Sequence, residues 1–227
     1  MIRAELHEPC VRPGTMVPGE VHLRAGVAAL PPGEVTLSVE TRTGVAVIRH
    51  RVAVVSPVPP GRSRSVPFLL PLPWETPLTR PIPAVSVLLR TEAHGESVVE
   101  PIDVHPLLGH QRVLDAARRL GFRLVDAALQ TGPLPGVLRA VSFHQEFTFR
   151  PPAGAELRVV TVAGPSAVDV VARLGGASLT FAVGADTDPF AVLRAWMLTQ
   201  IPALAPAPTP IPDRDATGDR LHPVLPT

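Results

Sequence analysis

The chain has 227 residues, long enough for one large domain or two smaller ones with packed cores. Its 21 Lys and Arg residues only balance 20 Asp and Glu residues, so it lacks the basic surface that binds phosphate backbones, and we expect no nucleic-acid partner. Proline and charged residues interrupt every apolar run well before the ~18 residues of a membrane span, and the single cysteine, Cys10, fits a reducing compartment. We expect a cytoplasmic protein with no membrane span.

Alternating apolar and polar residues characterise the first hundred positions. The segments 2–6, 21–25 and 35–39 place their apolar side chains on one face, as half-buried strands do. Turn-forming clusters such as Leu30-Pro31-Pro32-Gly33 separate these segments. Seven short strands with this spacing predict an antiparallel β-sandwich over residues 1–105.

Prolines mark one segment of this sandwich. Pro67, Pro71 and Pro73 lack the N–H donors that an interior strand needs, so 66–74 is predicted to be an edge strand or one that crosses between sheets. Trp74 ends this apolar run. We interpret it as a structural anchor of the first sandwich or of the domain interface.

The pattern changes after Pro106. Residues 107–120 contain no proline and place their apolar side chains on one helical face, with Gly121 at a C-cap position, so a linker helix is predicted over 106–121. Strand-like alternation then resumes and predicts a smaller C-terminal β-sandwich over 122–187.

A last helix is predicted over 188–201, because Asp188 can cap it and Pro189 suits its first turn. We expect this helix to pack on the second sandwich, and binding to a partner is the alternative. The proline-rich residues 202–227 are predicted to be a disordered tail. The apolar face of the helix, a candidate partner-binding surface, consists of Phe190, Leu193, Trp196 and Met197.

Four stretches, in order and spacing, resemble the sporulation stage-zero protein M family, bacterial relatives of arrestins. The resemblance implies an all-β fold of two arrestin-like antiparallel β-sandwich domains joined by a short α-helix. It also implies a regulatory protein without known catalytic activity, linked in the family's namesake to sporulation control. The four stretches are 13–26, 66–79, 104–124 with Val104-His105-Pro106 and Gln111-Arg112-Val113-Leu114, and 143–149 with Phe143-His144-Gln145-Glu146-Phe147.

Residues suited to catalysis or metal binding are sparse. His7 lies near Cys10, and His105 and His110 are five residues apart, but a zinc site needs three or four ligands, usually in close pairs. The sequence also contains no Gly-x-Ser-x-Gly motif and no phosphate-binding loop. We therefore predict no catalytic residue, no metal site and no cofactor.

These observations together predict a non-catalytic regulatory scaffold or adaptor that acts through contacts with other proteins. The strand edges, the loops and an interdomain groove are its expected contact surfaces. The expected setting is the control of sporulation, differentiation or cell development in a GC-rich bacterium. Two alternatives stay open: a self-associating structural or assembly module that forms homo-oligomers, and, less favoured, a small-molecule-binding enzyme.

Overall fold

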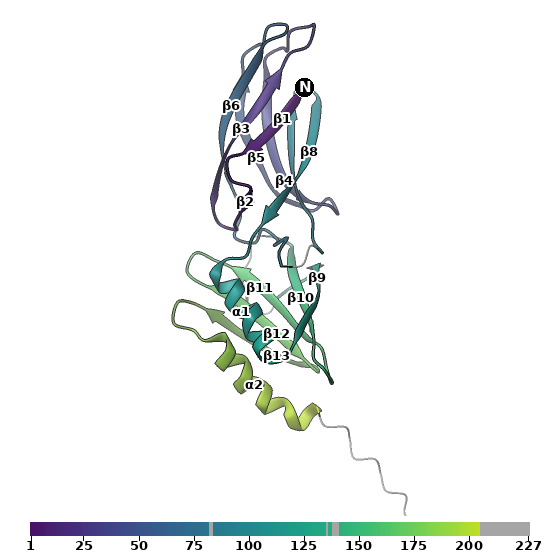
Figure 1. Cartoon of the computed structure of the whole chain (residues 1–227), viewed down its shortest axis with the longest axis vertical. Coiled ribbons are helices and arrows are strands. Elements are labelled where there is room, and N and C mark those ends of the chain that lie inside the picture. Colours follow the sequence, from purple (N-terminus) through teal and green to yellow (C-terminus); the bar gives the residue numbers. More distant parts are fainter. Residues whose placement is uncertain (82–83, 135, 138–140, 205–227) are drawn as a thin grey trace, which may run out of the picture.

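The computed structural model describes residues 1–81, 84–134, 136–137 and 141–204. The molecule is elongated, with two halves stacked end to end and both helices on the second half (Figure 1). The mostly-β class predicted from the sequence is confirmed.

The first half consists of two sheets. One is antiparallel in the order β1-β3-β6, and the other has the order β2-β8-β7-β4-β5, in which the two-residue strand β2 runs parallel to β8. Val21, Leu37 and Val39 are fully buried between the sheets, and Val21 and Val39 alternate with half-buried polar neighbours along their strands. Strand β6, which contains Pro67 and Pro71, lies at the edge of the first of these sheets, as predicted. The strands are β1 (Ile2–Leu6), β2 (Cys10–Val11), β3 (Met16–Arg24), β4 (Gly33–Thr41), β5 (Ala46–Val55), β6 (Ser63–Pro71), β7 (Val87–Ala93) and β8 (Glu96–Val104).

The second half differs from the predicted small sandwich, because its described strands form one antiparallel sheet in the order β13-β12-β11-β10-β9. Helix α1 (Leu108–Arg119) supplies the second layer that a sandwich would take from another sheet, and it buries Val113, Leu114 and Ala117. A smaller apolar cluster around Leu134 and Val137 covers part of the opposite face. The strands are β9 (Arg123–Thr131), β10 (Phe143–Arg150), β11 (Leu157–Ala163), β12 (Val168–Leu174) and β13 (Ala177–Val183).

The helix ends follow from local residues. Gly121 adopts a left-handed φ of 91°, and the N–H groups of Gly121 and Phe122 close the last turn of α1 on the carbonyls of Arg118 and Ala117. At the start of α2 (Pro189–Leu204), the carboxylate of Asp188 accepts a hydrogen bond from the N–H of Phe190.

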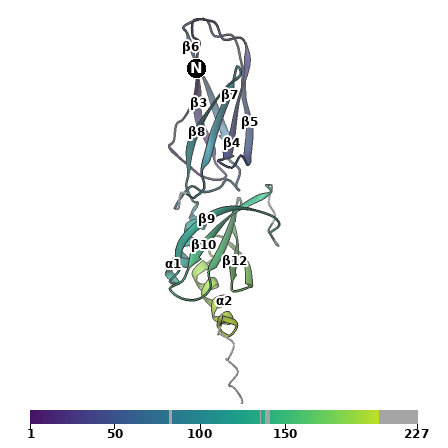
Figure 2. The same ribbon diagram turned by 90° about the vertical axis from the view of Figure 1, so that its right-hand side faces the viewer.

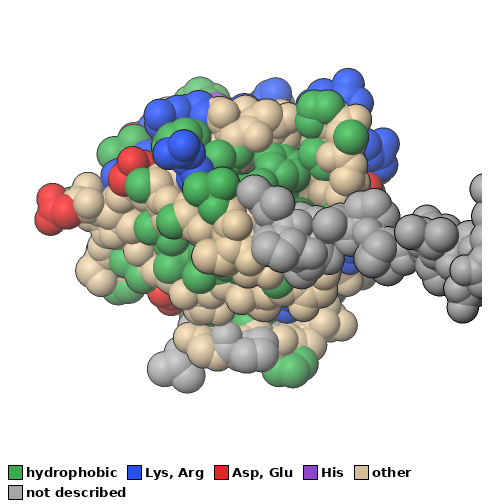
Figure 3. Space-filling view, turned by 90° about the horizontal axis from the view of Figure 1, so that it is seen from below, with side chains coloured by type: hydrophobic (Ala, Val, Ile, Leu, Met, Phe, Trp, Pro, Cys, Tyr) green, Lys and Arg blue, Asp and Glu red, His purple; other side chains and the backbone are tan. Residues whose placement is uncertain are grey.

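Helix α2 continues three residues beyond the predicted end at position 201. The remainder of the predicted disordered tail, 205–227, lies outside the described residues. Within the part of the chain that is described, neither helix has the length and apolarity to cross a bilayer. Viewed from below, apolar side chains are scattered over this end of the molecule and interspersed with charged ones (Figure 3).

One hydrophobic cluster runs through both halves, from Ile2 in β1 to Leu193 in α2. Leu72 and Leu78, which follow β6, and Phe143, at the start of β10, all belong to it. The halves therefore share buried surface at their junction.

Candidate functional site at the junction of the two halves

A buried amide joins the two halves. Gln145 lies in β10, and its Oε1 accepts a hydrogen bond of 2.8 Å from the N–H of Leu78, while its Nε2 donates one of 2.9 Å to the Leu78 carbonyl. Gln145 is 7% exposed and Leu78 2%. One side chain thus satisfies both polar groups of a buried residue that belongs to no sheet.

Trp74 lies at the same junction and is half-buried. Its ring covers Gly14, where an added Cβ would come within 2.3 Å of a ring carbon, so only glycine fits beneath it. Trp74, His110 and Gln145 line a cavity of about 20 Å³, enough for one water-sized molecule. The anchoring role of Trp74 remains a prediction that unfolding measurements can test.

His110 occupies the first turn of α1 and is 3% exposed. Burial lowers the pKa of its imidazole to about 4, because the charged form loses its hydration. Its Nδ1 accepts a hydrogen bond of 3.2 Å from the N–H of Leu107, which the neutral ring can do. His110 is therefore a neutral part of the junction at pH 7.

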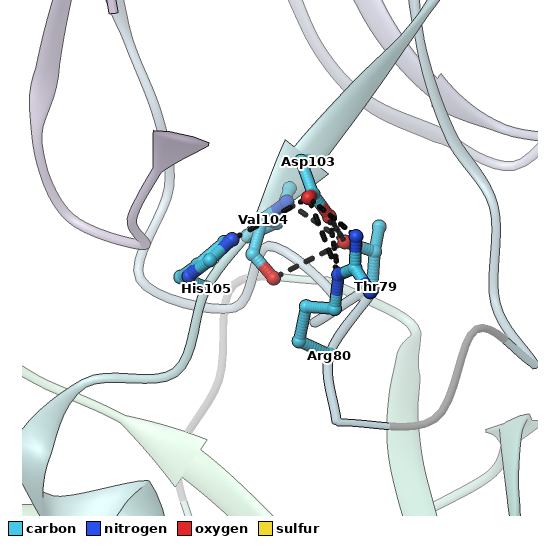
Figure 4. A network of polar contacts seen from close by, with 5 residues as sticks. All are labelled: Thr79, Arg80, Asp103, Val104 and His105. Atoms are coloured by element: carbon cyan, nitrogen blue, oxygen red, sulfur yellow. Dashed lines mark hydrogen bonds and ion pairs between the residues drawn. The ribbon is translucent and has the colours of Figure 1, made fainter. Parts of the chain in front are cut away.

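A polar cluster ties the segment after Leu78 to the end of β8 (Figure 4). Thr79 donates to a carboxylate oxygen of Asp103 at 2.6 Å and accepts from the N–H of Val104 at 2.9 Å. Arg80 approaches both Asp103 oxygens, at 3.0–3.2 Å. These hydrogen bonds, from Arg80 first and then Thr79, lower the pKa of Asp103 to about 2, so its carboxylate is charged at pH 7.

Strand β2 places Cys10 beside this cluster. Cys10 and Asp103 are direct partners in the parallel pair, and the N–H of His105 continues the pairing through a 2.8 Å bond to the Val11 carbonyl. Ligand atoms of Cys10, Asp103 and His105 all lie within 4.8 Å of one another. Sequence reasoning considered Cys10 only with His7, and His105 only with His110. The structure instead places Cys10 and His105 together and adds Asp103 to them.

A groove of about 590 Å³ separates the base of the first half from β9. The first half contributes the β4–β5 turn, including Arg42, and residues 84–86, while the second half contributes 126–129, Thr131 and Phe143. The turned view shows β9 along the base of the first half (Figure 2). Among the described strands, β9 pairs only with β10, so its other edge is available to another strand.

The predicted partner-binding residues lie on α2, away from this groove. Leu193 is fully buried, and Phe190, Trp196 and Met197 are half-buried against the core. The guanidinium of Arg119 in α1 lies 4.1 Å from the centre of the Phe190 ring. The helix therefore packs on its own half, and binding of a partner by its remaining exposed surface stays a prediction.

Sequence reasoning missed Gln145 and the cluster around Asp103. A signal for Gln145 was present, since it shares an inward-facing register with Phe143, Phe147 and Phe149, and a polar residue among buried aromatics must find partners. For Thr79, Arg80 and Asp103 no such signal exists, because the contact joins residues 23 and 24 positions apart.

Two stacked β-rich halves joined by a buried hydrogen-bonded junction define a two-part, mostly-β protein. Residues 1–174 match the family described as Spo0M: SpoOM protein, and the chain belongs to this family. It is similar to the crystal structure of Spo0M, sporulation control protein, from Bacillus subtilis, with a TM-score of 0.72 and 22% identity over 88% of this chain and 97% of that one.

A second solved structure is only distantly similar and supports no argument about fold or function. It is the Pseudomonas fluorescens alkylpurine DNA glycosylase AlkC bound to DNA, with a TM-score of 0.34 and 9% identity over 46% of this chain and 30% of that one. No curated protein matches the chain.

Proposed function

We propose that this protein is a non-catalytic, cytoplasmic regulatory adaptor that binds an extended segment of a partner protein in the groove between its halves. The regulatory part rests on membership of the Spo0M family, whose Bacillus subtilis member is a sporulation control protein. Sporulation or a related developmental programme is the proposed setting.

The observation that carries the proposal is the free edge of β9 beside the groove. An edge strand presents N–H and C=O groups that an added strand can pair with, whatever its sequence. Apolar residues such as Ala128, Leu129 and Phe143 line the same groove and provide contacts for alternate side chains of the added strand.

The charged residues of the groove indicate which charged residues a bound segment would carry. Arg42 of the first half and Asp126 of β9 are exposed members of the groove lining. A mainly apolar segment with one acidic and one basic residue would complement both. We therefore expect an extended, proline-poor partner segment, since proline lacks the donor that strand addition requires.

The test compares one substitution on two edge strands. Ala128→Glu puts a charge into the groove beside β9, whereas Ala182→Glu puts the same charge on exposed β13, the opposite edge of the same sheet. Proteins from the native bacterium that bind the parent chain and the β13 variant but not the β9 variant support the proposal. A partner retained equally by all three proteins would overturn it.

A hydrogen-exchange measurement on the captured complex locates the contact directly. Strand addition should protect the amides of 124–131 more than those of 177–183. Light scattering on the isolated chain separates this function from the alternative of a self-associating assembly module. A stable polymer whose interface protects the same β9 amides would replace the adaptor with that alternative.

A further inference from the structure

We propose that Cys10, Asp103 and His105 form a binding site for a divalent transition-metal ion of the Zn²⁺ class, with three protein ligands and an exchangeable fourth position. The site is separate from the β9 groove. It does not depend on the adaptor function.

The backbone itself arranges the three ligands. Cys10 and Asp103 are cross-strand partners, so their side chains leave the sheet on the same side, a few ångströms apart. His105 follows Asp103 by two residues in extended chain, which returns it to that face. Pro106 holds His105 in this conformation, because the residue before a proline is restricted to extended geometry.

The His105–Asp103 distance fits a shared ion better than a direct bond. Nε2 of His105 lies 3.4 Å from Oδ2 of Asp103, beyond the 2.7–3.2 Å of a good N–H···O hydrogen bond. A tetrahedral zinc ion with bonds of roughly 2.0–2.2 Å would separate a nitrogen and an oxygen ligand by about 3.4 Å. The thiol of Cys10 is exposed and within 4.8 Å of both, so rotation about its side-chain bond can complete the third contact.

Arg80 is compatible with such a site. It binds Asp103 as a fork and Thr79 bonds the same carboxylate, but an ionised carboxylate offers about four acceptor positions. Carboxylates that ligate metals are commonly held by outer hydrogen bonds of this kind, which fix their orientation. Arg80 and Thr79 thus act as positioning residues for Asp103.

The ligand types select the ion. One thiolate, one imidazole and one carboxylate suit Zn²⁺ and its analogue Co²⁺, whereas Mg²⁺ and Ca²⁺ prefer oxygen ligands alone. Cys10 and His105 also line a surface hollow of about 400 Å³ together with Glu8. The fourth position therefore opens towards this hollow, where a water molecule can occupy it.

Cobalt binding provides the test, because a Co²⁺–thiolate bond absorbs in the near ultraviolet. The full chain, freed of metal, should bind one Co²⁺ with this absorption, and Zn²⁺ should displace it. Cys10→Ser should abolish the band, and His105→Ala should weaken binding at least about tenfold. His50→Ala, which removes an imidazole on β5 remote in the sheet from β2, is the matched control and should bind as the parent does.

A second readout does not depend on cobalt. Zn²⁺ should raise the melting temperature of the parent chain and of His50→Ala but not of Cys10→Ser, and should slow alkylation of Cys10. The proposal is overturned if no charge-transfer band forms at millimolar Co²⁺. A band of equal strength in His105→Ala also overturns it, since this means that the exposed thiol alone binds the ion.

Discussion

Replacing Gln145 with alanine is the most direct test of the junction. The change leaves the N–H and C=O of Leu78 without their partners in a buried position. Each unpaired buried group costs about 1–3 kcal/mol, so the two together cost roughly 2–6 kcal/mol. The adjoining cavity of about 20 Å³ would enlarge and admit water to one of them, which puts the expected loss near 3 kcal/mol.

Thermal unfolding measures this loss. For a chain of this size, about 3 kcal/mol lowers the melting temperature by roughly 6–12 °C. Gln130→Ala is the matched control, since Gln130 lies on the neighbouring strand β9 and is exposed. It should change the free energy of unfolding by less than about 0.5 kcal/mol.

The two tryptophans allow the loss to be localised. Trp74 lies at the junction and Trp196 on α2, so a Trp196→Phe background leaves one fluorescent reporter at the contact. In that background, Gln145→Ala should shift the Trp74 transition to lower urea concentration. Equal stability of the Gln145 and Gln130 variants would refute the reasoning, because the amide would then contribute nothing to holding the halves together.

Three further predictions address other parts of the chain. Trp74→Ala should lower the free energy of unfolding by about 2–3 kcal/mol in urea titrations. This loss is smaller than that for a fully buried aromatic residue, because Trp74 is half-buried. A loss below about 0.5 kcal/mol would instead make Trp74 a candidate binding residue. Because the pKa of His110 is about 4 in the folded chain and 6.5 ordinarily, the unfolded chain binds the extra proton between these values. The free energy of unfolding should therefore fall as the pH drops from 6.5 to 4, by up to roughly 3 kcal/mol more than in His110→Gln, and equal pH profiles would contradict this. Deleting 205–227 should leave the melting temperature within about 2 °C of the parent value. Deleting 188–227 should lower it clearly or cause aggregation, because it exposes the surface that Leu193 covers. An unchanged melting temperature after the longer deletion would contradict the packing of α2 on the second half.

The first half was predictable because its signals are local. Alternation in 2–6 and 35–39, together with the prolines of β6, reports which face is buried and which strand lies at an edge. Gly121 and Asp188 fixed the ends of helices for the same reason, since each acts within a few residues of itself.

The layer opposite the second sheet could not be read from alternation. A strand such as β11 is buried on both faces whether a helix or another sheet covers it, so the pattern of 157–163 does not distinguish the two. The polar contacts of the junction were also out of reach, because Leu78–Gln145 and Arg80–Asp103 depend on the completed fold.

The segment after β6 has one more consequence. Leu78 is bonded to the second half through Gln145, and the next two residues are bonded to the end of β8 through Asp103. Three successive residues therefore connect the first half to the second, and moving Leu78 away from β10 requires both Gln145 hydrogen bonds to break. Separating the halves replaces these two hydrogen bonds with bonds to water and also exposes the apolar side chains that the halves bury together, so both terms set the population of the separated form. Any ligand that needs the halves apart must bind the separated form more tightly by this free energy, and weak, unspecific encounters therefore leave the protein unchanged.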